Sequence, residues 1–104
     1  MSGDLYMDAP FLYPKKESTV QSQGTMGLEA AMTIVRLEVE NAQRKHPVWA
    51  PGGITHAAAI VAEEAGELVR EALHLEHEGC GDEKKYLDEA IQTAAVAIRL
   101  LMNK

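Results

Sequence analysis

The chain has 104 residues, a net charge of −6 at pH 7 and a single cysteine, Cys80. A chain this short forms one domain with a thin apolar core, so we expect several copies to assemble. The acidic excess argues against binding to nucleic acid or to an anionic membrane surface, because both need clustered Lys and Arg. One cysteine cannot form an internal disulfide, and we find no signal peptide and no apolar run that would span a membrane. These features favour a reducing, cytoplasmic location.

Residues 1–25 show no helical period and contain Pro10, Pro14 and Gly24 together with a polar run from Ser18 to Gln23. This composition predicts an N-terminal arm or linker that precedes a domain at residues 26–104. The alternative is a disordered tail, but the arm holds apolar residues that favour packing on the body or on a neighbouring subunit: Leu5, Tyr6, Phe11, Leu12 and Tyr13.

Three helical segments follow, at about residues 27–45, 55–78 and 83–102. Thr55 and Asp82 are the expected N-caps of the second and third helices. The third helix is apolar around most of its circumference, so we expect it to be buried on both sides. The predicted fold is an all-α helical bundle of about three helices per chain, completed by oligomerisation. The apolar line of the first helix consists of Leu28, Met32, Val35, Val39 and Ala42.

The loop between the first two helices holds the only Trp, Trp49, close to Lys45 and His46. Such an aromatic residue beside cations can stack on a nucleobase whose phosphates meet the cations. A loop Trp can equally close the end of a helical bundle. Both interpretations stay open at this point.

The second helix carries an acidic patch. Glu64, Glu67 and Glu71 fall on one helical face, and Glu63 lies one turn before Glu67. Like charges at these spacings repel, so a bound cation that neutralises them is one hypothesis. The other is a solvated acidic face. Glu64 borders the apolar line and Glu67 lies further round on the same side, which turns both toward a groove beside the core.

The third helix has one polar line, formed by Lys85, Glu89, Gln92 and Arg99. Polar groups on a buried helix have to be paired or liganded. We therefore expect Glu89 and Gln92 to face the acids of the second helix, with Lys85 and Arg99 on either side of them.

The pattern Glu63-Glu64-x-x-Glu67, followed by Glu89-x-x-Gln92 in the next helix, resembles the Glu-Glu-x-x-Glu and Glu-x-x-Asp motifs of the MazG-like all-α nucleoside triphosphate pyrophosphohydrolases. Residues 89–98 are similar to the short, often phage-encoded members of that superfamily. The resemblance covers roughly residues 28–102. It implies cleavage of a nucleoside triphosphate between the α and β phosphates, giving a monophosphate and pyrophosphate, by a homodimer or homotetramer in a bacterial or phage-infected cytoplasm.

The resemblance also implies roles for particular residues. The ligands of Mg²⁺, or of Mn²⁺ in its place, would be Glu64, Glu67, Glu89 and Gln92, and catalytic roles would fall to Glu63 and Glu64. The candidates for contacts with the phosphates are Lys85, Arg99 and Lys45, and those for contacts with the base are Trp49 and His46.

Gln92 is neutral where the superfamily usually has Asp, which removes one charge from the implied metal site. A catalytically silent nucleotide-binding or dimerisation module of the same fold is therefore an alternative function. A di-iron bundle is a second alternative, suggested by Glu71-x-x-His74, although that architecture needs such a pair on two helices.

Overall fold

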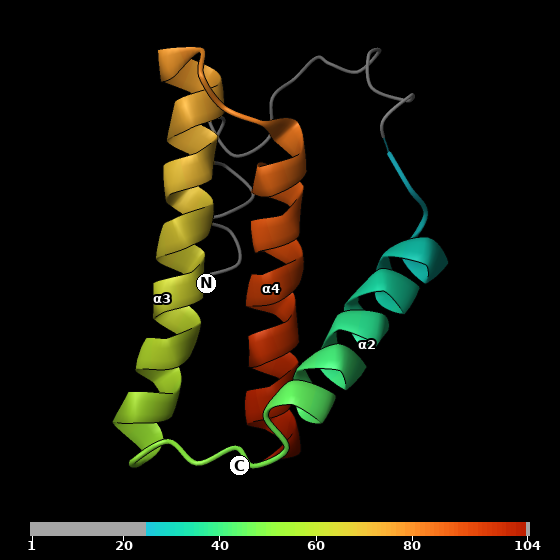
Figure 1. Ribbon diagram of the computed structural model, residues 1–104, viewed down its shortest axis with the longest axis vertical. Helices are drawn as coiled ribbons and strands as arrows, with labels where there is room; N and C mark the ends of the chain where they lie inside the picture. Colours follow the sequence, from blue (N-terminus) through green and yellow to red (C-terminus); the bar gives the residue numbers. More distant parts are fainter. Residues whose placement is uncertain (1–24, 104) are drawn as a thin grey trace, which may run out of the picture.

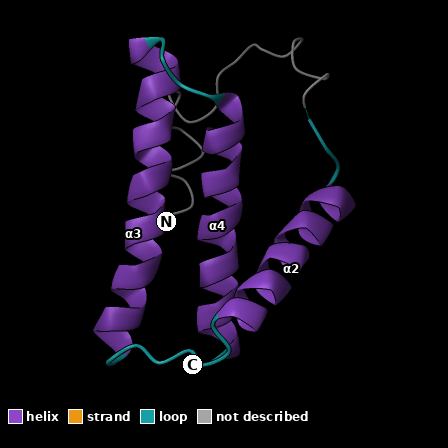
Figure 2. Cartoon of the chain, viewed as in Figure 1, coloured by secondary structure: helices purple, strands orange, loops and turns teal. Residues whose placement is uncertain are grey.

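The computed structural model describes residues 25–103, which form three α-helices. They are α2 (Leu28–Lys45), α3 (Ile54–Leu73) and α4 (Glu83–Met102), and α3 continues into a π-helical turn, η3 (His74–Glu78). This stretch contains no strand, so the all-α prediction is confirmed (Figure 2). Over the same stretch, no helix combines the length and apolar character that crossing a membrane requires. The arm predicted for residues 1–25 lies, apart from Thr25, outside the described residues.

Helix α4 is the central element. Figure 1 shows α3 and α4 side by side in opposite directions, whereas α2 is inclined to α4 and meets it near the carboxyl ends of both helices. From Glu89 to Leu100, no residue of α4 is exposed. A helix that is apolar around its circumference is stable only when neighbours cover it on several sides. The expectation that this helix is buried on both sides is met in part: α3 and α2 both contact it, but its fully buried residues are Ala95 and Arg99.

The apolar core is small. Within the described residues, Val39 and Ala95 are the buried hydrophobic residues, while Met32 and Met102 are 49% and 55% exposed. The apolar line of α2 shows why, because Val39 is covered by α4 whereas Leu28, at the diverging end of α2, is 72% exposed. Three helices of this length do not enclose all of their apolar side chains.

Of the two predicted N-cap residues, one is confirmed and the other is wrong. Asp82 is the N-cap of α4, and its side chain accepts a hydrogen bond from the Lys84 backbone N–H at 2.9 Å, as predicted. The prediction of Thr55 as the N-cap of α3 is wrong, because α3 begins at Ile54 after Gly53. Gly53 is the N-cap residue, and its φ of 154° is a conformation that only Gly adopts readily. Thr55 is therefore already the second residue of the helix.

The turn that joins η3 to α4 depends on two glycines. Gly79 has a φ of 64°, in the left-handed region that ends many helices. At Gly81 the backbone passes so close to the preceding turn that a Cβ atom there would lie 2.5 Å from the Leu75 nitrogen and 2.7 Å from its Cα. Backbone atoms cannot rotate away as a side chain does, so position 81 requires Gly.

We expect Gly81→Ala to destabilise the protein by about 2 kcal/mol, because the added methyl group forces the turn open. Gly66→Ala is the matched control: Gly66 lies inside α3, a Cβ there meets nothing within 4 Å, and Ala should stabilise the helix by up to about 1 kcal/mol. Thermal unfolding followed by circular dichroism measures both changes. Equal melting temperatures for the two variants would contradict the close approach at Gly81.

Candidate functional site

Four carboxylates come together between α3 and α4. Glu64, Glu67 and Glu71 lie three and four residues apart on α3 and are all half-buried. Glu89 of α4 faces them, and all three raise its pKa. We call Glu64, Glu67, Glu71 and Glu89 the carboxylate cluster. The partial burial of Glu64 and Glu67 agrees with the expectation that these acids lie beside the core, while the groove that the sequence analysis expected there stays a prediction.

Glu89 carries the electrostatic cost of the cluster. Its pKa is raised chiefly because burial removes water from the carboxylate, and then by the negative charges of Glu64 and Glu67. A hydrogen bond with Glu64, available to the protonated form, and the charge of Glu71 raise the pKa further. Among residues 25–103, its Oε1 atom is buried without a hydrogen-bond partner. When Glu89 is ionised, this oxygen is an acceptor that no donor in that part of the chain satisfies.

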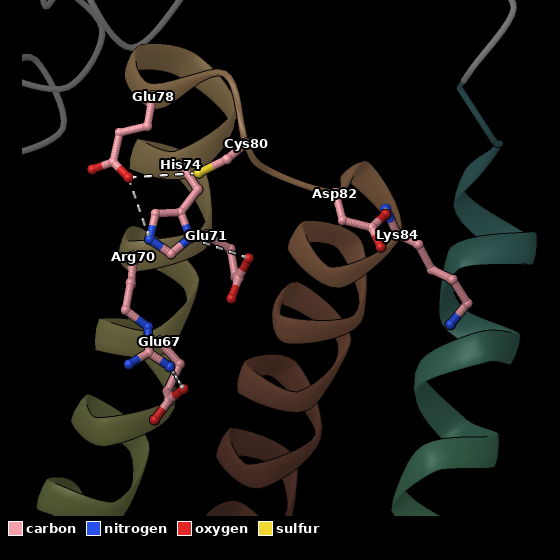
Figure 3. Close-up of polar contacts among 8 residues, drawn as sticks. All are labelled: Glu67, Arg70, Glu71, His74, Glu78, Cys80, Asp82 and Lys84. Atoms are coloured by element: carbon pink, nitrogen blue, oxygen red, sulfur yellow. Dashed lines mark hydrogen bonds and ion pairs between the residues drawn. The ribbon is translucent and has the colours of Figure 1, made fainter.

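The other members of the cluster differ in their partners. Arg70 donates a hydrogen bond to Glu67 at 2.8 Å, and His74 Nδ1 lies 3.9 Å from Glu71 (Figure 3). Across residues 25–103, neither Glu64 nor Glu89 forms an ion pair. The least compensated charges are therefore the two carboxylates at the contact between the helices.

The donor chemistry of the cluster suits a hard cation, because Mg²⁺ prefers oxygen ligands. The unsatisfied Glu89 Oε1 is the kind of oxygen that a cation would complete. In the part of the chain that the structure describes, no three His, Cys, Asp or Glu side chains converge closely enough to hold a metal ion. The side chains of the carboxylate cluster would have to change rotamer for three of them to share one ion.

Gln92 lies on a different side of α4 from the carboxylate cluster. It lines a hollow of about 360 Å³ between α4 and α2, together with Glu38, Asn41 and Asp88. The structure thus groups Glu64, Glu67 and Glu89 as the sequence analysis expected, and it places Gln92 toward α2. It also adds Glu71, whose spacing of four residues from Glu67 is the signal that could have included it among the ligands.

The remaining predicted site residues are spread along the molecule. Glu63 is exposed on α3, next to the cluster in sequence but turned to solvent. Lys85 is exposed on α4, one turn before Glu89. Lys45 and His46 are exposed at the carboxyl end of α2. Among the predicted cations, Lys85 is the one whose position on α4 brings it nearest to the cluster.

Arg99 is bound at the end of α2. It is 6% exposed and donates hydrogen bonds to the backbone carbonyls of His46, at 2.7 Å, and Ala42, at 3.5 Å. Its guanidinium lies 5.5 Å from the centre of the Trp49 ring. Ten residues separate Arg99 from Glu89, about 15 Å along a helix. Arg99 therefore fastens α2 and its loop to α4, far from the cluster.

Trp49 is half-buried and borders a hollow of about 690 Å³ that is also lined by Ile54, Ala57 and Leu100. It covers Arg99 and closes this end of the helices, which agrees with the interpretation of a loop Trp that closes the end of a bundle. Trp49 is only partly covered, and stacking of its ring on a base stays a prediction.

At the other end of α3, His74 lies between two carboxylates (Figure 3). Its Nε2 atom is 3.7 Å from Glu78, and Glu78 also accepts a hydrogen bond from Cys80 Sγ at 3.7 Å. His74, the first residue of η3, thus lies between Glu71 of the cluster and Glu78 at the end of the same turn.

Comparisons of this chain with models of protein families, with curated proteins and with solved structures gave no match.

We expect Glu89→Gln to raise the melting temperature at pH 7 by on the order of a few degrees, since it removes the charge of a half-buried carboxylate that faces three others. The folded-state pKa of Glu89 is raised, so its contribution to stability is present at low pH and is lost as the pH rises through that pKa. The gain from Gln should accordingly shrink as the pH falls toward 4. Melting curves between pH 4 and pH 8 measure it.

Glu76→Gln is the control for this prediction, because the Glu76 side chain is 73% exposed and lies outside the cluster. A loss of stability in Glu89→Gln, or a gain that is equal at every pH, would show that the charge of Glu89 is not opposed by its neighbours.

We expect Arg99→Met to lower the free energy of unfolding by about 2–4 kcal/mol, because it removes charged donors from two carbonyls of α2 and the following loop. Trp49 is the only Trp, so its emission should shift to the red as the loop opens. Lys85→Met, at an exposed position, serves as the control. Unchanged stability of Arg99→Met, with a higher KM for a nucleotide, would instead assign Arg99 to phosphate binding.

Proposed function

We propose that this protein is a Mg²⁺-dependent nucleoside triphosphate pyrophosphohydrolase, with Mn²⁺ able to replace Mg²⁺, and that it acts in the cytoplasm as a homodimer or homotetramer. The observation that carries the proposal is the unsatisfied carboxylate of Glu89 opposite Glu64 and Glu67. These residues belong to two motifs that occur in the same order, each within a helix, as in the MazG-like superfamily.

In this proposal, Glu64, Glu67 and Glu89 hold the ion, and Gln92 contributes its amide oxygen if its side chain turns from the α2 side. Glu71 adds negative charge beside them. A bound divalent ion would neutralise charge on the phosphates and make a bound water more acidic. Glu63, exposed next to Glu64, is positioned to accept a proton from water that approaches from solvent.

The proposed reaction is hydrolysis of one phosphoanhydride bond. Water adds to a phosphorus atom of the α–β linkage, the bond from that phosphorus to the bridging oxygen breaks, and one water proton passes to a carboxylate. The products are a nucleoside monophosphate and pyrophosphate. Lys85 is the cation closest in sequence to the cluster on α4, so it is the first candidate for contact with the phosphates. Lys45, His46 and Trp49 lie at the opposite end and would meet nucleotide held by another subunit.

A catalytically silent nucleotide-binding or dimerisation module is the second candidate. Two observations favour it: Gln92 brings no charge, and no three potential ligands converge among residues 25–103. The same experiment separates the two candidates.

The test is release of monophosphate and pyrophosphate from the eight common ribo- and deoxynucleoside triphosphates, with Mg²⁺ and with EDTA. We expect Mg²⁺-dependent turnover that falls by on the order of 100-fold or more in Glu64→Ala, since Glu64 would hold the ion. Glu76→Ala, at an exposed position outside the cluster, should retain activity. Absence of turnover by the unaltered protein, with nucleotide binding seen by calorimetry, would establish the silent module instead.

A further inference from the structure

A groove lies between α2 and α4. Its volume is about 600 Å³, and its walls are apolar side chains of both helices: Met32, Val35, Val39, Ala94, Ile98 and Met102. Both methionines are about half-exposed, although Met32 belongs to the apolar line of α2. An open groove lined by apolar side chains offers a surface on which a partner can bury apolar groups of its own.

The rim of the groove carries two opposite charges one helical turn apart, Arg36 and Glu40. Both are exposed, and across residues 25–103 neither forms an ion pair. A two-fold axis reverses the direction of α2, so it would bring Arg36 beside Glu40 of the partner subunit and Glu40 beside the partner's Arg36. The rim is therefore complementary to itself, which is the requirement for a symmetric dimer.

We infer that a second copy of this chain covers the groove, with its α2 antiparallel to the first and its apolar residues against Met32, Val35 and Ile98. The methionines suit such a contact because their side chains adapt to irregular surfaces. The interface also completes the cover of α4, which already packs against α3 and α2. This inference deepens the oligomeric part of the proposed function by naming the surface.

The test compares the full-length protein with Arg36→Glu, Glu40→Arg and the double variant that carries both changes. Light scattering after size-exclusion chromatography, over a range of concentrations, gives the mass. We expect twice the 11.4 kDa of one chain, or a larger assembly that contains this dimer. Each single variant places two pairs of like charges across the two-fold axis and should raise the dimer Kd by on the order of tenfold. The double variant should restore the original Kd.

Glu76→Lys is the control, since it reverses an exposed charge away from the groove and should leave the mass unchanged. Circular dichroism confirms that each variant is folded. A monomer at every concentration would overturn the inference and indicate that another segment or another protein covers the groove. Single variants that weaken the dimer without restoration in the double variant would also overturn it, because the pairing would not be symmetric.

The hydrolysis assay on the same samples separates this inference from the proposed function. A dimer that obeys the charge reversal but turns over no nucleotide supports the interface and contradicts the enzyme. Turnover by a strictly monomeric protein supports the enzyme and contradicts the interface.

Discussion

The carboxylate of Glu89 sets the central constraint on this structure. It lies where α4 meets α3, beside three further carboxylates, and within residues 25–103 one of its oxygens has no hydrogen-bond partner. An apolar side chain at this position would pack at lower cost, since burying an uncompensated charge opposes folding. The arrangement is therefore poor for the stability of the isolated chain and well suited to binding a positively charged ion. A carboxylate that lowers stability at this position is the strongest structural argument that the cluster has a function.

Helix α4 connects this cluster to the rest of the molecule. Its α3 side carries Glu89, whereas its opposite side lines the apolar groove with α2. Arg99 donates hydrogen bonds to two carbonyls at the carboxyl end of α2 and in the loop after it, and holds that end on α4. Within the described part of the chain, no such bond joins α4 to residues 28–41 of α2, and the two helices diverge toward the amino end of α2 (Figure 1). The divergence opens the groove. One helix thus supports both the charged site and the surface on which we expect a second copy, which is why assembly and catalysis are linked in the proposal.

Much of the fold followed from the sequence, because apolar spacing and strong end signals determine helices locally. The bounds of α2 and α4 and the cap at Asp82 are local features of this kind. Thr55 failed as a cap because the φ of Gly53 starts α3 earlier, and residue type alone does not reveal that angle. The hydrogen bonds of Arg99 to α2 and the following loop could not be predicted from the sequence either, since its partners lie more than fifty residues away. Contacts of that range depend on how the helices cross.

The position of Gln92 connects the site to the packing of α2. The hollow that it lines already contains two acidic residues, Glu38 and Asp88. An Asp at position 92 would add a further negative charge within one turn of Glu89, whose pKa is already raised by its neighbours. A neutral amide avoids that repulsion and can both donate and accept hydrogen bonds. Gln92 is thus compatible with a close approach of α2. A neutral side chain at position 92 therefore follows from how α2 packs on α4, whichever ligand the carboxylate cluster binds.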